Sequence, residues 1–443
     1  MSFTAIIAVL VVASLGIGVI LPVPHRFIKR GQRSAGRYVT RVCAAATVGV
    51  ALAAVGATAA SASGAAPRVL PTARAIEAGT SLAATSPGAQ LWAARYDNPG
   101  NGGATSVAVS PDANTAFVTG YITVGAAEDY STVAYNEVTG AQLWAARYND
   151  PGHTFDKAYS VAVSPDGKAV FVTGASLTTA GGENYATVAY SAATGAQLWA
   201  ARYDGPSNNG AAAQVAVSPN GTAVFVTGSS LGTPTGEDYA TVAYSAATGT
   251  QLWAARYNGF GSGGNYASSV AVSPNGTAVF VTGTSLGTND GYDYATVAYS
   301  AATGAQLWVN RYDGASNGDR GANSVAVSAG TVFVTGSSYG GSTANYDYAT
   351  VAYSAATGAQ LWVKRYDGPG SGDDRAYSVA VSPSGGTVFI TGYTDTTSTS
   401  AGYDYTTIAY NAATGAQLWL TRYNGSSSFT DEAFSVAVSP NGG

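Results

Sequence analysis

Seven tryptophan residues recur along the chain at intervals of 52 to 57 residues. Each lies in one copy of the phrase G-A-Q-L-W-x-x-R-Y, in which Thr250 replaces the alanine of one copy. Self-similarity at a period of this size is typical of repeat architectures and constrains the fold before any local pattern does. The seven residues are Trp92, Trp144, Trp199, Trp253, Trp308, Trp362 and Trp419.

One repeat unit, residues 159–203, contains the pattern of four short strands. Residues 160–164, 170–174, 185–190 and 198–203 are rich in β-branched and aromatic side chains, as strands are. Ser-Pro-Asp-Gly at 164–167 and Ala-Ala-Thr-Gly at 192–195 supply turn residues between them. Four strands joined by tight turns make one propeller blade, so we predict an all-β propeller over residues 89–443.

The strand count predicts six complete blades. The S-V-A-V-S and L-W-x-x-R-Y strands occur seven times, and the V-F-V-T-G and D-Y-A-T-V-A-Y strands six times. An outermost strand at 91–96 and an innermost strand at 435–439 are left over, as the two ends of an incomplete seventh blade. A seven-bladed design that lacks the middle of one blade is our interpretation. The alternative is a closed six-bladed ring with two extra strands.

The repeated tryptophan and arginine have structural roles in this interpretation. A tryptophan buries a large apolar area and needs an acceptor for its indole N–H, which suits packing between neighbouring blades. The arginine lies three positions further along, on the opposite face of the strand. Hairpin register would bring it near the acid that opens the preceding strand, so we expect the ion pairs Arg147 with Asp129 and Arg256 with Asp238.

Two families of propellers share these motifs. A-Y-S-A-A-T-G-A-Q-L-W at 189–199 resembles the tryptophan-docking motif of quinoprotein (PQQ-like) propellers, A-x-D-x-x-T-G-x-x-x-W. Ser191 replaces the aspartate of that motif, as Asn136 and Asn411 do in other copies. V-A-V-S-P-D-G-K-A-V-F-V-T-G at 161–174 is similar to the repeats of YVTN-type and other seven-bladed bacterial surface propellers. Together the two resemblances cover nearly all of residues 89–443.

The quinoprotein resemblance implies a pyrroloquinoline quinone cofactor beside a calcium ion, near a disulfide of adjacent cysteines. Cys43 is the single cysteine of the chain and lies in the N-terminal segment, so that disulfide cannot form. No other cofactor residue of the family is matched position by position. We therefore read the resemblance as one of fold and assign no quinone-binding residue.

The N-terminal part differs in charge from the rest. Residues 1–88 hold eight Lys or Arg and one acid, a net charge of +7, and the remainder holds 12 basic and 24 acidic residues, a net charge of −12. An acidic propeller argues against nucleic-acid binding.

Two apolar runs, 5–23 and 42–60, flank a basic stretch, which predicts a signal or membrane segment over 1–62. Either both runs cross the membrane, or translation begins near Val39 and the second run is a signal peptide. Both place the propeller outside the cytoplasm, behind a flexible linker at 63–88.

Variable loops follow L-W-x-x-R-Y and V-F-V-T-G, whereas the S-P-D-G and A-A-T-G turns barely vary. Because strands alternate in direction, the two variable sets emerge on one face, which we name the variable-loop face. Loops on a rigid scaffold commonly carry function. Calcium prefers oxygen ligands, so the acids of these loops are calcium candidates, although solvated turns are the simpler explanation and the one we favour. The candidates are Asp290, Asp293, Asp319, Asp373 and Asp374.

Catalytic patterns are absent from the repeat sequence. His25 and His153 are the only histidines, so no Ser-His-Asp set or His/Cys metal cluster can be assembled. The near-identity of the blades also argues against an enzyme, since catalysis needs a few groups placed asymmetrically. We expect an exported, non-enzymatic propeller that binds a protein partner or a cell-surface ligand. The alternatives are a quinone-dependent oxidoreductase and a calcium-dependent surface protein that binds or cleaves glycans.

Overall fold

The computed structural model describes residues 90–96, 101–150, 155–177, 181–232, 236–260, 263–287, 291–314, 321–340, 345–370, 372–396, 402–425 and 430–439. The predicted signal or membrane segment at 1–62, the linker at 63–88, and Asp290 and Asp319 lie outside these ranges. Within the described residues, no helix has the length and apolar character that crossing a membrane requires.

Six antiparallel sheets of four strands follow one another along the chain, and within each sheet the strands lie in sequence order. Blades 1 to 3 consist of β1 Gly102–Val109, β2 Thr115–Val124, β3 Ala127–Asn136, β4 Gln142–Tyr148; β5 Asp156–Val163, β6 Ala169–Leu177, β7 Glu183–Ser191, β8 Gln197–Tyr203; β9 Gly210–Val217, β10 Ala223–Leu231, β11 Glu237–Ser245 and β12 Gln251–Tyr257. Blades 4 to 6 consist of β13 Asn265–Val272, β14 Ala278–Leu286, β15 Tyr292–Ser300, β16 Gln306–Tyr312; β17 Gly321–Ser328, β18 Thr331–Tyr339, β19 Tyr346–Ser354, β20 Gln360–Tyr366; β21 Arg375–Val381, β22 Thr387–Asp395, β23 Tyr403–Asn411 and β24 Gln417–Tyr423.

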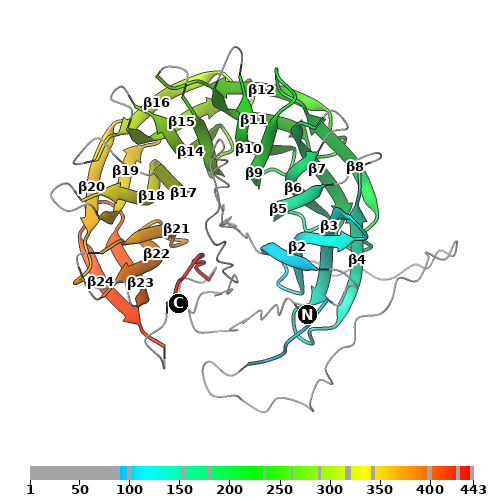
Figure 1. Ribbon diagram of the computed structural model, residues 1–443, viewed down its shortest axis with the longest axis horizontal. Helices are drawn as coiled ribbons and strands as arrows, with labels where there is room; N and C mark the ends of the chain where they lie inside the picture. The colour runs from blue at the N-terminus through cyan, green and yellow to red at the C-terminus, as the bar shows by residue number, and fades with distance from the viewer. Residues whose placement is uncertain are drawn as a thin grey trace, which may run out of the picture.

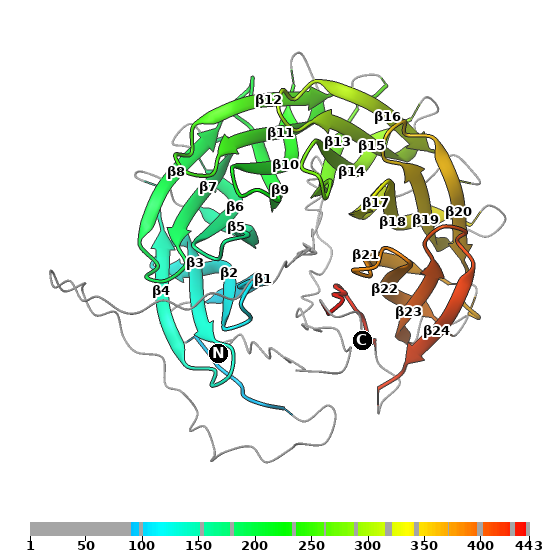
Figure 2. The ribbon, with the colours of Figure 1, turned by 180° about the vertical axis from the view of Figure 1, so that it is seen from behind.

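The six sheets stand as blades around a common axis, with the first strand of each blade innermost and the fourth at the rim (Figure 1). The view from behind shows the same arrangement and the same opening, which lies between blade 1 and blade 6 (Figure 2). The predicted all-β propeller with six complete blades is therefore confirmed. Among the described residues no four-stranded sheet lies between blade 6 and blade 1, which is where the predicted incomplete seventh blade falls.

Burial explains why these segments form strands. In β7, seven consecutive residues from Asn184 to Tyr190 are buried, because blades pack face to face and both surfaces of a middle strand are covered. A near-continuous apolar run is the expected pattern for a strand covered on both faces. The outermost strand β8 instead buries Trp199 and exposes its neighbours, since it lies at the rim.

Tight turns close one face of the ring. In the Ser-Pro-Asp-Gly turn, the Gly167 N–H donates to the Ser164 carbonyl at 2.9 Å, and Gly167 has a φ of 71°, as the sequence predicts. The Ala192 N–H donates to the Lys168 carbonyl at 2.9 Å, so these two turns lie side by side. The variable loops emerge at the other ends of the strands, on the opposite face.

The tryptophans join neighbouring blades, as predicted. The Trp144 ring lies 5.7 Å from Phe117 of its own blade and 6.4 Å from Tyr190 of the next, between ring centroids. Its indole N–H donates to the Ala192 carbonyl of the next blade at 2.8 Å. A Cβ on Gly195 would lie 2.7 Å from the Trp144 ring, so that turn position accepts only glycine. The same contacts recur at each of the other interfaces between complete blades.

Candidate functional site on the variable-loop face

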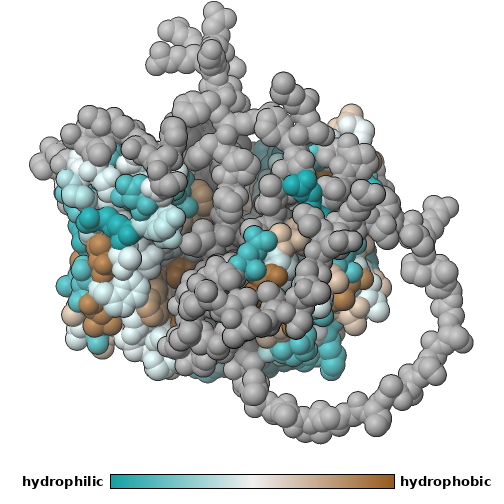
Figure 3. Space-filling model, turned by 90° about the horizontal axis from the view of Figure 1, so that it is seen from below, coloured by the Kyte–Doolittle hydropathy of each residue, from teal (hydrophilic) through white to brown (hydrophobic). Residues whose placement is uncertain are grey.

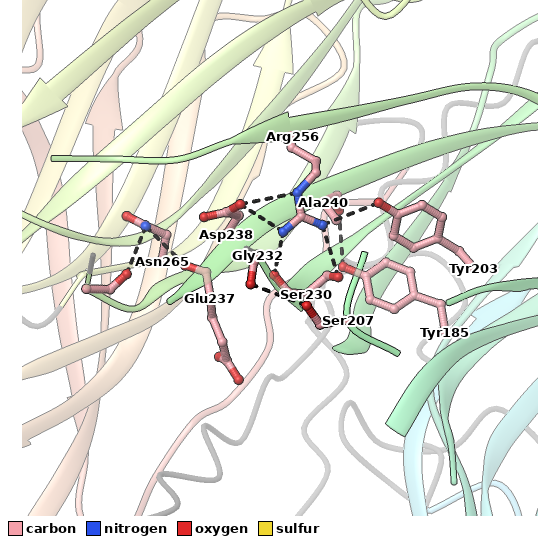
Figure 4. A network of polar contacts seen from close by, with 11 residues as sticks. Tyr185, Tyr203, Ser207, Ser230, Gly232, Glu237, Asp238, Ala240, Arg256 and Asn265 are labelled. Carbon is pink, nitrogen blue, oxygen red and sulfur yellow. Dashed lines mark hydrogen bonds and ion pairs between the residues drawn. The ribbon is translucent and has the colours of Figure 1, made fainter. Parts of the chain in front are cut away.

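An arginine-centred network with the same kinds of partner joins blades 2 and 3, blades 3 and 4, and blades 4 and 5 at their variable-loop ends. Figure 4 shows the network around Arg256. Arg256 donates to the Asp238 carboxylate at 2.8 Å and to the Ser230 hydroxyl at 3.0 Å. It also reaches the Tyr203 hydroxyl of the preceding blade at 3.4 Å. Both predicted ion pairs are present, since Arg147 contacts Asp129 in the same way. This network is structural, because it joins three strands of one blade to the rim of another.

Two of the predicted calcium ligands are engaged in ion pairs. The Asp293 carboxylate accepts hydrogen bonds from Arg311 at 2.9 and 2.7 Å, so it belongs to the repeated network. The Asp373 carboxylate contacts Arg375 at 2.6 Å. The fold does not bring these two carboxylates together, because Asp293 lies in β15 of blade 4 and Asp373 lies just before β21 of blade 6.

Asp374, the fifth candidate, belongs to a cluster of three carboxylates at the junction of blades 5 and 6. Asp347, Asp367 and Asp374 each offer an oxygen within 4.8 Å of the others. Asp374 is fully buried and accepts main-chain hydrogen bonds from Gly368 at 2.6 Å and from Asp395 at 3.0 Å. We call this set the carboxylate cluster.

Burial raises the pKa of Asp374 to about 7, with a further contribution from the charges of Asp367 and Asp347 and an opposing one from the two N–H donors. Arg365 neutralises Asp347 at 2.9 Å, and Asp367 is exposed. Three carboxylates with one open side fit a hard cation such as calcium once Asp374 has lost its proton. Asp367 and Asp374 would hold the ion, with Asp347 shared with its arginine.

Beside the carboxylate cluster, aromatic side chains surround Arg375. Its guanidinium lies 5.5 Å from the Tyr346 ring and 5.9 Å from the Tyr393 ring. The Tyr393 and Tyr403 rings are 4.5 Å apart. Tyr346, Arg375 and Tyr403 are partly exposed, whereas Tyr393 is buried. We call Tyr346, Tyr393, Tyr403 and Arg375 the aromatic cluster.

Sequence reasoning missed the aromatic cluster, although a signal for it exists. A glutamate stands at or next to the start of the third strand in the first three blades, and a tyrosine opens that strand in the last three. This difference among otherwise similar blades marks one sector of the variable-loop face. The residues concerned are Glu128, Glu183 and Glu237 in blades 1 to 3 and Tyr292, Tyr346 and Tyr403 in blades 4 to 6.

His153 and Cys43 lie outside the described residues, and the ranges that the structure describes contain neither histidine nor cysteine. In those ranges the carboxylate cluster is the one group of three metal-ligating side chains close enough to share an ion.

Comparison with known proteins identifies a repeat family. The chain matches a PQQ-like repeat family whose description is outer membrane protein assembly factor BamB. The matches cover residues 129–289, 237–390 and 293–441. No curated protein matches the chain.

Solved structures share the architecture. The periplasmic gluconolactonase PpgL of Pseudomonas aeruginosa is 17% identical over 79% of this chain and 92% of its own, with a TM-score of 0.51. The Dos1 propeller is 10% identical over 77% of this chain and 74% of its own, also with a TM-score of 0.51. BamB from Moraxella catarrhalis is 16% identical over 73% and 74%, with a TM-score of 0.38. At these identities the first two likenesses show the propeller fold alone.

Proposed function

This chain belongs to the PQQ-like repeat family described as outer membrane protein assembly factor BamB, and from that premise we propose that it is an exported, non-enzymatic propeller that binds a protein partner at its variable-loop face. The aromatic cluster is the observation that carries the proposal. Tyrosine and arginine are enriched where protein interfaces concentrate their binding energy. One sector of an otherwise repetitive face bears both, beside acidic side chains.

The repeated arginine networks and the tight turns support the scaffold part of this proposal. They engage the arginines and acids of most blades internally, as with Arg256 and Asp238. The rings of Tyr346 and Tyr403 pack against neighbouring side chains and are partly exposed on the variable-loop face. The net charge of −12 on residues 89–443 favours a partner with a basic surface around an apolar contact.

Export is the second part of the proposal. It rests on the basic and apolar pattern of residues 1–62, which is typical of a signal or membrane segment. Fractionation of cells that produce the full chain, with detection of the propeller outside the cytoplasm, tests this part by itself.

The binding proposal is tested by substitution on the two faces. A partner captured by crosslinking is identified, purified, and titrated against the full chain by calorimetry. The double variant Tyr346→Ala and Tyr403→Ala is expected to weaken binding at least tenfold, about 1.4 kcal/mol. Val138→Ala, at a 73% exposed position on the opposite face, is the matched control and should leave the affinity unchanged. Equal weakening by both variants, or turnover of a sugar, lactone or alcohol by the purified protein, would contradict the proposal.

Calcium binding at the carboxylate cluster is a second candidate function, favoured by the three converging carboxylates. Titration at pH 8, where Asp374 is ionised, is expected to show one ion bound. Asp367→Asn should abolish that binding. Asp313→Asn, at the equivalent exposed position of the preceding blade, should not, because the residue equivalent to Asp374 there is Arg320. Absence of binding by the unaltered chain at pH 8 would eliminate this candidate.

A further inference from the structure

One pair of positions recurs at the blade interfaces on the variable-loop face. The first lies at or next to the start of the third strand of a blade, and the second at the start of the first strand of the next blade. Strand register identifies the second position, because Lys157 and Ala211 each pair with the residue that follows the V-F-V-T-G motif. In chain order the five pairs are Glu128 with Lys157, Glu183 with Ala211, Glu237 with Tyr266, Tyr292 with Gly321, and Tyr346 with Arg375.

Where both positions of a pair carry a polar group, the two side chains meet. The Glu128 carboxylate lies 3.0 Å from the Lys157 ammonium. The Tyr266 hydroxyl donates a hydrogen bond to the Glu237 carboxylate. The aromatic cluster contains a third such contact. The two positions therefore face each other across the interface between blades.

The first interface is an internal example of ammonium recognition. Besides its ion pair with Glu128, the Lys157 ammonium lies 4.6 Å from the centroid of the Tyr121 ring and 4.4 Å from that of the Phe155 ring. The Lys157 side chain is 23% exposed, so its charge is held in a partly desolvated place by a carboxylate and two aromatic rings. Both kinds of contact stabilise a cation.

The second interface keeps the carboxylate of this pair and lacks the cation. Ala211 takes the place of Lys157 and has no atom beyond Cβ that could reach Glu183. Among the residues that the structure describes, Glu183 forms no ion pair with a lysine or arginine. Burial and then the charge of Glu183 raise the pKa of Tyr159 to about 12, so the Tyr159 hydroxyl lies near this carboxylate.

Charge, rather than hydropathy, distinguishes this part of the molecule. Hydrophilic and hydrophobic residues are intermixed on the side of the ring seen in Figure 3. At the second and third interfaces, by contrast, two carboxylates lie within range of each other. Burial raises the pKa of Glu237, hydrogen bonds from Ser229 and Tyr266 oppose the rise, and the charge of Glu183 adds to it. The Glu237 side chain points away from the network of Arg256 (Figure 4).

The described lysines of the chain are placed elsewhere. Lys157 occupies the first interface, Lys168 follows the Ser-Pro-Asp-Gly turn on the opposite face, and Lys364 lies in the rim strand β20. The fourth lysine of the sequence, Lys29, lies outside the described ranges. The described part of the chain therefore supplies no ammonium group to Glu183.

We propose that Glu183, Glu237, Tyr159 and Ala211 form a binding site for the ammonium group of a lysine side chain that belongs to another protein. Glu183 takes the part of Glu128 as the ion-pair partner, and Glu237 adds a second negative charge. Ala211 leaves vacant the position that a lysine fills at the first interface. We call this set the ammonium site. It lies at blades 2 and 3, away from the aromatic cluster of blades 5 and 6, so its test is independent of the partner proposed there.

A lysine suits the ammonium site better than an arginine does. The ammonium is a compact charge with three donors and can lie between two carboxylates, whereas the planar guanidinium pairs best with both oxygens of a single one. The example at the first interface is itself a lysine on an extended strand. An extended segment of the other protein can present its side chain in the same way.

The test uses an acetylated, fluorescein-labelled peptide in which lysine alternates with glycine. It is titrated into the full chain at low ionic strength and followed by fluorescence anisotropy. We expect saturable binding that added salt weakens. Glu183→Gln, which keeps the shape of the side chain, should weaken binding by about fivefold or more, and the same peptide with arginine in place of lysine should bind less tightly.

A lysine built into the site is the sharpest variant. Ala211→Lys copies the first interface and is expected to abolish peptide binding. Ala193→Lys adds the same charge at an exposed turn position on the opposite face, so as the matched control it should leave the affinity within about twofold. A second readout needs no peptide. Ala211→Lys should raise the melting midpoint by about 2 °C more in the unaltered chain than in the Glu183→Gln chain.

Four results would overturn the proposal. They are the absence of saturable binding, equal weakening by the two lysine variants, equal binding of the arginine peptide, and no difference between the two melting shifts. Binding of glucosamine oligomers but not of the lysine peptide would assign the site to an amino sugar and overturn it too. A zero-length carbodiimide cross-link between Glu183 and Lys29, formed without peptide, would show that the chain fills the site itself.

Discussion

At the scale of single residues, the glycine of the Ala-Ala-Thr-Gly turn meets two separate demands. Gly249 has a φ of 70°, which residues with a Cβ rarely adopt, and a Cβ there would lie 2.7 Å from the Trp199 ring of the preceding blade. The motif T-G-x-x-x-W therefore couples one blade to the next. Its glycine receives the tryptophan of the preceding blade, and its own tryptophan docks on the following one.

Substitution separates the two demands on that glycine. Gly249→Ala is expected to cost more than about 3 kcal/mol, because the strained backbone and the displaced Trp199 add together. Gly125 has a φ of 65°, and a Cβ there would meet no other atom within 4 Å, so Gly125→Ala should cost only about 1 kcal/mol. Urea unfolding of both variants gives the comparison. Equal costs would show that the tryptophan contact contributes nothing.

Asp374 makes stability depend on pH. Its folded pKa of about 7 lies above the ordinary value of 3.8, so the folded chain binds the proton more tightly than the unfolded chain. The resulting stabilisation is present at low pH and is lost as pH rises through about 7. Asp374→Asn is expected to flatten the fall in melting temperature between pH 5 and 8. An unchanged pH profile in that variant would show that Asp374 does not titrate in this range.

At the scale of elements, the position of a strand in its blade decides which of its residues are buried. Middle strands such as β11 bury both faces, whereas rim strands such as β12 bury one tryptophan and expose their flanks. The last strand, β24, has the same sequence pattern as β12 but is exposed along nearly its whole length. Identical repeats thus acquire different surroundings from their place in the ring.

The tryptophans of these two rim strands should consequently differ in their contribution to stability. Trp253→Ala removes a ring buried between two blades and is expected to cost about 3–5 kcal/mol. Trp419→Ala removes a ring that is 44% exposed and should cost less than about 2 kcal/mol. Chemical denaturation of the two variants, monitored by far-ultraviolet circular dichroism, measures the difference. Similar costs would mean that Trp419 is covered in solution.

At the scale of the whole molecule, six nearly identical blades build a rigid scaffold on which two clusters share one sector. The aromatic and carboxylate clusters both lie at blades 5 and 6 on the variable-loop face. Blade 6, which carries Arg375, Tyr393 and Tyr403, is also the last complete blade before the gap to blade 1 (Figure 1).

The sequence by itself determined the repeat, the all-β blades, the tight turns, the tryptophan interfaces and the ion pairs of Arg147 and Arg256. These depend on periodicity and on neighbouring strands, where register follows directly from the chain. The tertiary structure decided which blade receives each tryptophan, that Asp374 meets Asp347 and Asp367, and that Arg375 lies among tyrosines. Those contacts join residues of different blades, and their geometry depends on how blades stack around the axis. Local pattern carries no measure of that stacking, so the tyrosines at the start of the third strand mark the sector in the sequence, but the contacts within it emerged only in three dimensions.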